Sequence, residues 1–312
     1  MNVKEFGSLL KQAFQSWNED KATRLAAALS FYAVFAIAPV LIIALAIAGQ
    51  VLGPAEVQTR LMNQLTATIG PQGADLIQSM LENARKPADS VVASILALAT
   101  LILGAAGAFG QLQDALNTIW EVKARTGSVI RRLLAEKFLS FLMVMGLGLV
   151  LLVSLIASTA LSALNTPIGS PTTPLTDLLG IINLFVSFGV ITLVFAVILK
   201  VIPDVQLHWR DVWSGALLTA VLFTLGKYAI GWYLSHSSIG SAYGAAGSLV
   251  IILLWIDYSA QIFLLGAEFT KMYTRRFGSP VQPTPQAQAV TAEARAQEGL
   301  AAPAPPPGDA SH

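Results

Sequence analysis

The chain has 312 residues, and only 37 of them are charged: 19 Lys and Arg, and 18 Asp and Glu. Charged residues therefore make up 12%, hydrophobic residues make up 54%, and the mean hydropathy is +0.64. This composition excludes a disordered chain and argues against a single water-soluble globule, because a water-facing surface needs far more charge. Long uncharged runs between charged clusters indicate a chain that crosses a bilayer several times.

Composition also limits the chemistry. The net charge of +1 argues against a basic nucleic-acid binder, and the absence of cysteine excludes disulfides, thiol nucleophiles and cysteine-ligated metal sites. The three histidines are scattered, and the chain has no HExxH, nucleophile or Walker A motif. We therefore expect no enzyme, no metal, no cofactor and no nucleic-acid partner.

The first segment, residues 1–24, is amphipathic and polar, so we expect no cleaved signal peptide. Apolar residues recur at helical spacing, with lysines and an arginine between or after them: Val3, Phe6, Leu10, Phe14 and Trp17. This pattern predicts an interfacial helix with its apolar side toward lipid or protein. A soluble helix that caps the molecule is an equal alternative.

Residues 25–277 predict an all-α, polytopic membrane domain. A hydrocarbon core of about 30 Å needs roughly 20 helical residues, and the uncharged runs supply six such spans. Pro39 lies inside the first span as a predicted kink. A stretch rich in proline and glycine, residues 165–174, predicts a loop after the third span. The predicted spans are residues 25–52, 90–113, 138–163, 178–199, 212–235 and 248–270.

The distribution of Lys and Arg predicts the orientation. With the N-terminus inside, four basic residues precede Leu25, five lie in residues 123–137, two in 200–211 and four after the last span. Fifteen of the 19 basic residues thus lie on the inner side and only three on the outer side. Both termini are therefore expected in the cytoplasm of a cell whose inner membrane holds the protein.

Two segments outside the spans have distinct patterns. In the outer segment 56–87, apolar residues recur at helical spacing on both sides of Gly70-Pro71, which predicts two short amphipathic helices. The tail, residues 278–312, is rich in Pro, Ala and Gln and is expected to be disordered and cytoplasmic.

Ionisable residues inside a span are the strongest indicators of function. Lys227 in the fifth span and Asp257 in the sixth fall at similar depths on helices that a short loop joins, which predicts an ion pair. A purely structural lock between two helices and a path for substrate or protons are equal alternatives. Snorkelling toward the outer boundary is a further possibility for Lys227.

The sixth span also carries a polar stripe. Asp257, Gln261 and Glu268 share one helical face with Leu264. On the fifth span, Ala216, Ala220, Lys227 and Gly231 share a face on which small residues would admit another backbone. Glu268 falls near the inner boundary, where it could pair with Lys271 or Arg24.

Glycines mark candidate hinges or packing positions. Gly104, Gly107 and Gly110 recur every three residues in the second span, and tight helix packing is favoured over an unwound segment that lines a substrate path. Residues 237–247, with Gly244 and Gly247, are too rich in small residues for a plain helix end and suggest a tight turn or a re-entrant piece.

Five stretches resemble the YihY/BrkB family of bacterial inner-membrane proteins: LAAALSFYAVFAIAP at 25–39, GAFGQLQDALNTIWEV at 107–122, YGAAG at 243–247, LWIDY at 254–258 and GAE at 266–268. The resemblance runs from residue 1 to about 277. It implies six membrane helices with both termini cytoplasmic. Members of the family are associated with serum resistance and virulence, relatives with export of envelope lipids, and an old ribonuclease label persists. The resemblance supplies no catalytic residues.

The leading functional hypothesis is a transporter or flippase of a lipid-like envelope component. A membrane scaffold or envelope-assembly factor is the alternative, and a membrane-bound enzyme ranks third. The expected partners are membrane lipids, with a second copy of the chain or an envelope protein as further possibilities.

Overall fold

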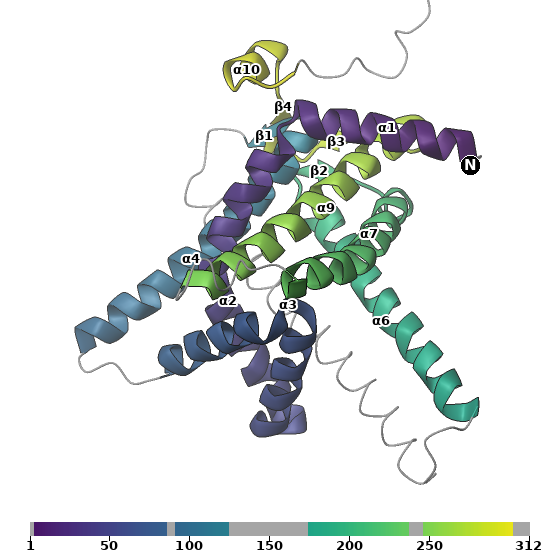
Figure 1. The fold of residues 1–312 in the computed structure, drawn as a ribbon. Helices are drawn as coiled ribbons and strands as arrows, with labels where there is room; N and C mark the ends of the chain where they lie inside the picture. Colours follow the sequence, from purple (N-terminus) through teal and green to yellow (C-terminus); the bar gives the residue numbers. More distant parts are fainter. Residues whose placement is uncertain (1–2, 86–90, 125–173, 237–245, 302–312) are drawn as a thin grey trace, which may run out of the picture.

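The structure, a computed structural model, describes residues 3–85, 91–124, 174–236 and 246–301. It is mostly helical, and four very short strands lie near one end of the helices (Figure 1). The helices are α1 (Val3–Glu19), α2 (Ala22–Leu52), α3 (Pro54–Arg85), α4 (Val91–Ile119), α6 (Pro174–Val201), α7 (Trp209–His236), α9 (Gly247–Phe277) and α10 (Ala292–Gln297). The strands are β1 (Val122–Ala124), β2 (Val205–Gln206), β3 (Gln282–Pro283) and β4 (Ala287–Ala289).

Five of the six predicted spans coincide with α2, α4, α6, α7 and α9, and the third, residues 138–163, lies outside the described residues. Within the described ranges, two helices are long and apolar enough to cross a bilayer: α7 over Trp209–Tyr233 and α9 over its whole length. A third span is counted if α1 and the first part of α2 are taken together. These helices make the chain a membrane protein, while the count of six spans stays a prediction.

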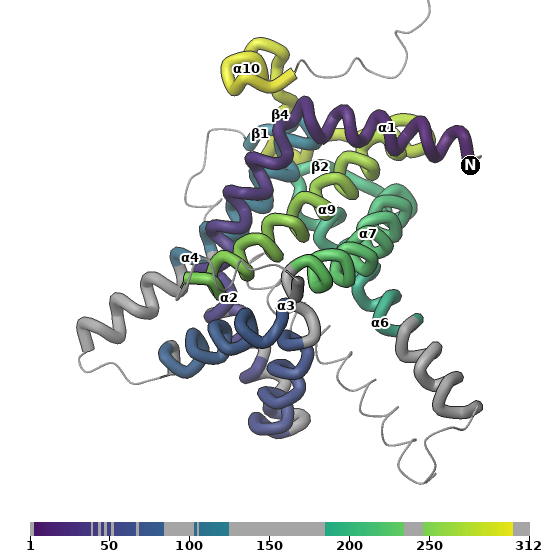
Figure 2. Tube along the Cα trace, in the orientation of Figure 1, coloured from purple at the N-terminus to yellow at the C-terminus, as the bar shows by residue number. Residues whose placement is uncertain are grey.

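Helices α1 and α2 meet at a sharp elbow. Their axes differ by 68°, and Lys21 between them adopts a left-handed backbone with φ of 52°. From the elbow, α1 runs across the end of α9, where Leu9, Ala13 and Phe269 form a small buried cluster. Figure 2 shows this crossing at the α1 end of the molecule. Part of the apolar side of α1, around Leu9 and Ala13, therefore contacts protein, whereas Val3 and Phe14 are exposed.

Helix α3 lies at the opposite end and is broken where the sequence predicted (Figure 1). Gly70 has φ of 79° and ψ of 169°, which is outside the helical region, and Pro71 starts the second limb. Val57, Ile69, Ile77 and Leu81 pack both limbs against the lower parts of α2 and α9. The prediction of two amphipathic helices is thus confirmed.

Small residues bring α7 and α9 into close contact. A Cβ atom added at Gly215 would collide with Thr270, and one at Gly266 would collide with Thr219. Each threonine hydroxyl instead donates to a backbone carbonyl of its own helix, Thr219 to Gly215 and Thr270 to Gly266, at 2.8 Å. The two glycine–threonine contacts fix how α7 and α9 pack against each other.

The expectation of a disordered tail is wrong for residues 278–301. Strand β4 pairs antiparallel with β1, and β3 pairs with β2 in the connection between α6 and α7. The tail then forms α10, whose first turn is capped when the Thr291 hydroxyl accepts from the Ala294 amide. Composition suggested disorder because the tail is rich in Pro, Ala and Gln, but strand edges elsewhere in the fold give its backbone hydrogen-bond partners.

Candidate functional site

The polar stripe on α9 divides into two parts. In the first part, the Gln261 amide donates to Asp257 Oδ2 at 2.6 Å. The other Asp257 oxygen, Oδ1, is buried and has no hydrogen-bond partner among the described residues. The Trp17 indole of α1 donates to the Gln261 carbonyl at 3.3 Å, which ties this part of α9 to the elbow. An acidic side chain in this position is costly inside a span and therefore marks a candidate site.

The predicted ion pair between Lys227 and Asp257 is absent from the ion pairs of the described residues. Lys227 Nζ lies 4.9 Å from the ring centre of its neighbour Tyr228. The reason is helical phase: Gly226, not Lys227, packs against Tyr258 of α9. The next residue is turned by about 100°, so Lys227 points away from that contact.

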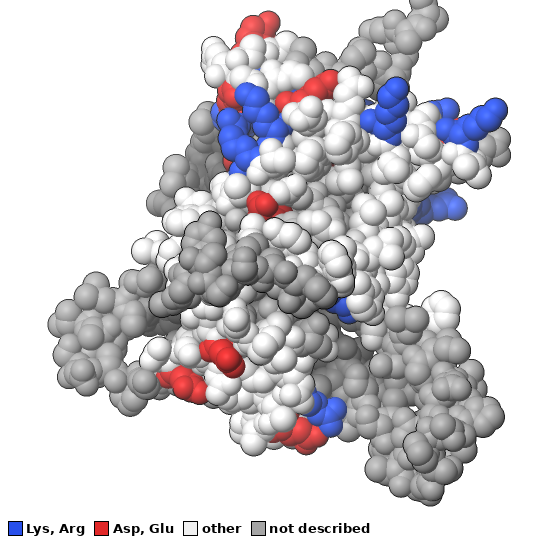
Figure 3. Space-filling view, viewed as in Figure 1, with Lys and Arg blue, Asp and Glu red and all other residues white. Residues whose placement is uncertain are grey.

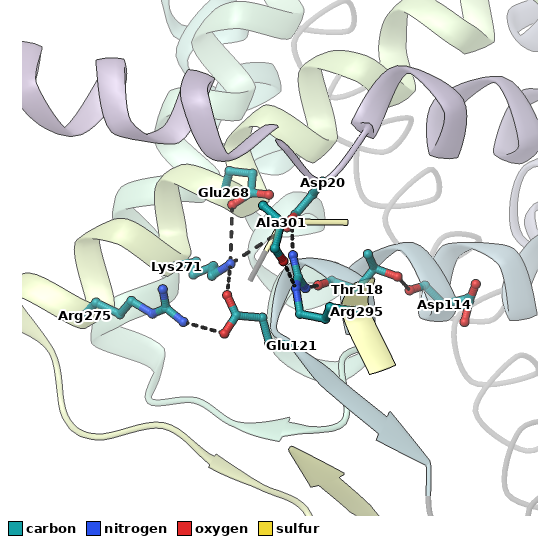
Figure 4. Close-up of polar contacts among 9 residues, drawn as sticks. All are labelled: Asp20, Asp114, Thr118, Glu121, Glu268, Lys271, Arg275, Arg295 and Ala301. Atoms are coloured by element: carbon teal, nitrogen blue, oxygen red, sulfur yellow. Dashed lines mark hydrogen bonds and ion pairs between the residues drawn. The ribbon is translucent and has the colours of Figure 1, made fainter. Parts of the chain in front are cut away.

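The second part of the stripe belongs to a buried charge cluster. Glu268 is fully buried, and its Oε2 lies 4.0 Å from Lys271 Nζ. Around this pair, Figure 4 shows side chains from the α1–α2 elbow, the end of α4, the end of α9 and the tail. We define the buried charge cluster as Asp20, Glu121, Glu268, Lys271, Arg275 and Arg295.

Lys271 is the centre of the cluster. Its Nζ lies 2.8 Å from Glu121 Oε1 and 3.9 Å from Asp20 Oδ2, in addition to the contact with Glu268. The second oxygen of Glu121 accepts from Arg275 Nη2 at 2.9 Å. Lys271 and Arg275 are one helical turn apart, so both reach the same carboxylate from one face of α9.

Arg295 enters the cluster from α10. Its Nη2 donates to Asp20 Oδ1 at 2.5 Å, and both side chains are only 2–3% exposed. Its other nitrogens donate to two backbone carbonyls, Nη1 to Thr118 at 3.2 Å and Nε to Ala301 at 2.6 Å (Figure 4). The planar guanidinium fork suits three acceptors in fixed directions.

Nearby cations lower the pKa of Glu121. Burial alone would raise the pKa of Glu121, but Lys271, which also hydrogen-bonds it, together with Arg275 and Arg295, holds that pKa below its ordinary value. Lys271, Arg275 and Arg295 thus favour the ionised form of Glu121. Lys21 and Glu121 are the non-glycine residues with positive φ in the described ranges, and both lie at this cluster. Such strained backbone often accompanies functional positions.

A second polar junction joins α4 to the loop before α7. The Asn117 side-chain amide donates to Asp204 Oδ2 at 2.8 Å and accepts from the Asp204 backbone amide at 2.8 Å, and Gln113 adds a donor at 3.3 Å. The stretch QLQDALNTIW thus carries contacts that hold the loop. Sequence reasoning missed this junction, although Asn and Gln one helical turn apart at the end of an apolar helix are a signal for it.

The candidate hinge and packing residues have different outcomes. A Cβ at Gly104 or Gly107 would lie within 3 Å of Phe35 or Tyr32, so packing of α4 against α2 is confirmed there. Gly110 has no described atom within 4 Å of that position, and its role in packing stays a prediction. Gly247 begins α9, Gly244 lies outside the described residues, and α2 continues as a helix past Pro39.

Charge is distributed unevenly over the surface. Figure 3 shows basic and acidic side chains at the α1 end, a nearly uncharged middle, and a few charged groups near α3. Between the two limbs of α3, a hollow of ≈ 420 Å³ is lined mostly by uncharged polar side chains. Its lining residues are Ala55, Gln58, Thr59, Met62, Asn63 and Gln78.

Apolar helices with a charge cluster at one end define an integral membrane protein. The sequence model of the family described as "Virulence factor BrkB" matches residues 13–291, and the chain belongs to this family.

Similar proteins carry only a general name. A UPF0761 membrane protein of Aggregatibacter aphrophilus is 28% identical over 82% of this chain and 88% of its own length. One of Haemophilus influenzae is 27% identical over 86% and 94%, and one of Yersinia pestis is 31% identical over 69% and 70%. No solved structure matches the chain.

Proposed function

We propose that this protein moves a lipid-like envelope component across the bacterial inner membrane, with both termini in the cytoplasm. The observation that carries the proposal is Asp257, whose Oδ1 is buried without a hydrogen-bond partner among the described residues, in a helix long and apolar enough to span a membrane. Membrane proteins retain such groups where a polar substrate or ion passes. In this proposal Asp257 and Gln261 contact the polar headgroup, and no residue acts as a catalyst.

The family and the uneven surface charge support the proposal. The excess of Lys and Arg at the α1 end agrees with a cytoplasmic position for that end. A lipid headgroup that crosses between leaflets needs a polar surface within the bilayer, and Asp257 and Gln261 offer one on α9.

The experiment compares Asp257→Asn and Gln261→Ala with the unaltered chain in a strain that lacks the protein. Lipid composition of the two membranes and resistance to envelope stress are measured. We expect both variants to insert normally and to lose complementation. Glu82→Gln, which neutralises an exposed acid on α3, is the matched control and should complement fully. Full complementation by Asp257→Asn would refute the proposal.

The Lys227→Met variant tests whether Lys227 belongs to the same substrate path as Asp257 and Gln261. Because its ammonium lies over Tyr228 and not on Asp257, we expect a smaller loss than with Asp257→Asn.

A scaffold or envelope-assembly factor is the second candidate, and the polar hollow in α3 favours it. A partner that docks there would co-purify with the chain and be lost when residues 56–87 are deleted. In that case Asp257→Asn would leave the phenotype unchanged, which separates the two candidates.

A further inference from the structure

The tail crosses the ends of several helices. Residues 279–301, here called the strap, pair through β4 with β1, directly after α4, in the register Val122↔Ala289 and Ala124↔Ala287. They also pair through β3 with β2, just before α7. Two further backbone bonds, from Val290 to Glu121 and from Thr284 to Asp204, are 2.9 Å long. The strap therefore holds two connections that are about 80 residues apart in the sequence.

Arg295 fastens the strap to the elbow. Its bond to Asp20 joins α10 to the turn between α1 and α2, and its bond to the Thr118 carbonyl joins α10 to the last turn of α4. The Lys123–Glu298 pair at 3.5 Å is more than half exposed on both sides and adds little. Arg295 is thus the buried anchor of the strap.

Removal of Arg295 would affect Asp20 most. Its Oδ1 would lose the guanidinium, and Lys271 Nζ, 3.9 Å from Oδ2, would be its remaining ion-pair partner among the described residues. A buried carboxylate in that state favours any rearrangement that hydrates it. The turn that carries Asp20 is the elbow, where Lys21 already has a left-handed backbone.

Few contacts hold the strap in place. Its strands are two and three residues long, and the side chains that it buries deeply are few: Ala287, Arg295 and Leu300. Short exposed strands with little apolar burial open at a lower free energy than packed helices. The ion pair fixes where the strap docks more than it adds to stability.

We propose that the strap is a reversible latch. When docked, it holds the α1–α2 elbow and the ends of α4 and α9 together; when it lifts, Asp20 becomes hydrated and the elbow opens. The latch does not depend on what the protein transports, or on whether it transports at all.

The absence of native cysteine makes the latch measurable with the full-length, detergent-purified protein. Ala22 lies at the elbow and is 0% exposed, so the thiol of an Ala22→Cys variant should react slowly with a maleimide. We expect Arg295→Ala to accelerate this reaction by roughly ten- to hundredfold, since a buried ion pair is broken. An Ala216→Cys thiol, equally buried in α7, is the control and should react at an unchanged rate.

A disulfide tie provides the reverse test. Lys123 and Gln288 are exposed register partners in β1 and β4, so Lys123→Cys with Gln288→Cys should form a bond within one chain on oxidation. The oxidised tie should slow labelling of the Ala22→Cys thiol, with Arg295 present or replaced, and reduction should restore the faster rate.

Two results would overturn the latch proposal. The first is that no disulfide forms between the two strands. The second is that the labelling rate of the Ala22→Cys thiol changes neither on oxidation of the tie nor on replacement of Arg295. If Arg295→Ala does not fold, Arg295→Lys takes its place, because lysine retains the positive charge but not the guanidinium fork. The disulfide tie in the otherwise unaltered chain also tests the latch on its own.

Discussion

Lys271 contacts three carboxylates while it is only 2% exposed, so it is the single cation on which the charge cluster depends most. Breaking a buried ion pair by removing one partner costs about 3–5 kcal/mol, because the remaining charge stays buried and uncompensated. We expect Lys271→Met to lower the free energy of unfolding by about that amount. Thermal unfolding in detergent, followed by tryptophan fluorescence, measures the loss. Lys11→Met on the exposed face of α1 should leave the transition in place.

Glu121 makes the cluster sensitive to acid. Its pKa in the folded state is below the unfolded value, so its contribution to stability is fully present above the unfolded pKa of about 4.3. The contribution is lost as the pH falls through the folded pKa. We expect the unfolding temperature of the unaltered chain to drop more steeply below about pH 4.3 than that of Glu121→Gln, which lacks this titration. If the unfolding temperature falls equally with pH in the two proteins, Glu121 is not the source of the acid sensitivity.

The candidate site was only partly predictable at this scale. The spacing of Asp257, Gln261 and Glu268 on one face follows from helical geometry, and the structure retains it. Lys271 was considered as a partner of Glu268, and the structure shows that pair. Arg275 was interpreted only as evidence for orientation, because the positive-inside rule explains such a residue without a partner. The pairing of Asp20 with Arg295 joins residues 275 apart, and no local pattern carries that information.

The contact between α7 and α9 depends on two glycines at the scale of helices. A methyl group at Gly266 would collide with Thr219, so we expect Gly266→Ala to destabilise the protein by about 1–3 kcal/mol through overpacking. Gly231→Ala on α7, where a Cβ meets no described atom within 4 Å, is the matched control. It should be neutral or stabilising by up to about 1 kcal/mol, because alanine favours the helix. Thermal unfolding of both variants is the measurement.

The elements themselves were largely predictable. Uncharged runs predicted α2, α4, α6, α7 and α9, and Gly70-Pro71 predicted the break in α3. The important glycines of α7 were not the predicted ones: Gly215 and Gly226 face α9, whereas Gly231 does not. The choice among them depends on the rotation of one helix against another, which only packing decides.

The orientation of the whole molecule can be tested with single cysteines. We expect a membrane-impermeant maleimide to label Thr59→Cys on α3 in intact spheroplasts, and to label Lys11→Cys on α1 and Gln288→Cys on the tail only after lysis. All three positions are exposed, so differences in labelling report the side of the membrane. Labelling of Lys11→Cys before lysis would contradict a cytoplasmic N-terminus.

The scarcity and placement of charge determined, from sequence alone, that this is a helical membrane protein, because burial of apolar helices in a bilayer depends on composition and length. The tertiary structure decided which charges meet. It separated Lys227 from Asp257, gathered six ionisable side chains at the α1 end, and ordered a tail that composition had suggested was disordered. These outcomes depend on helix rotation and on contacts distant in sequence, and neither is encoded in a local pattern.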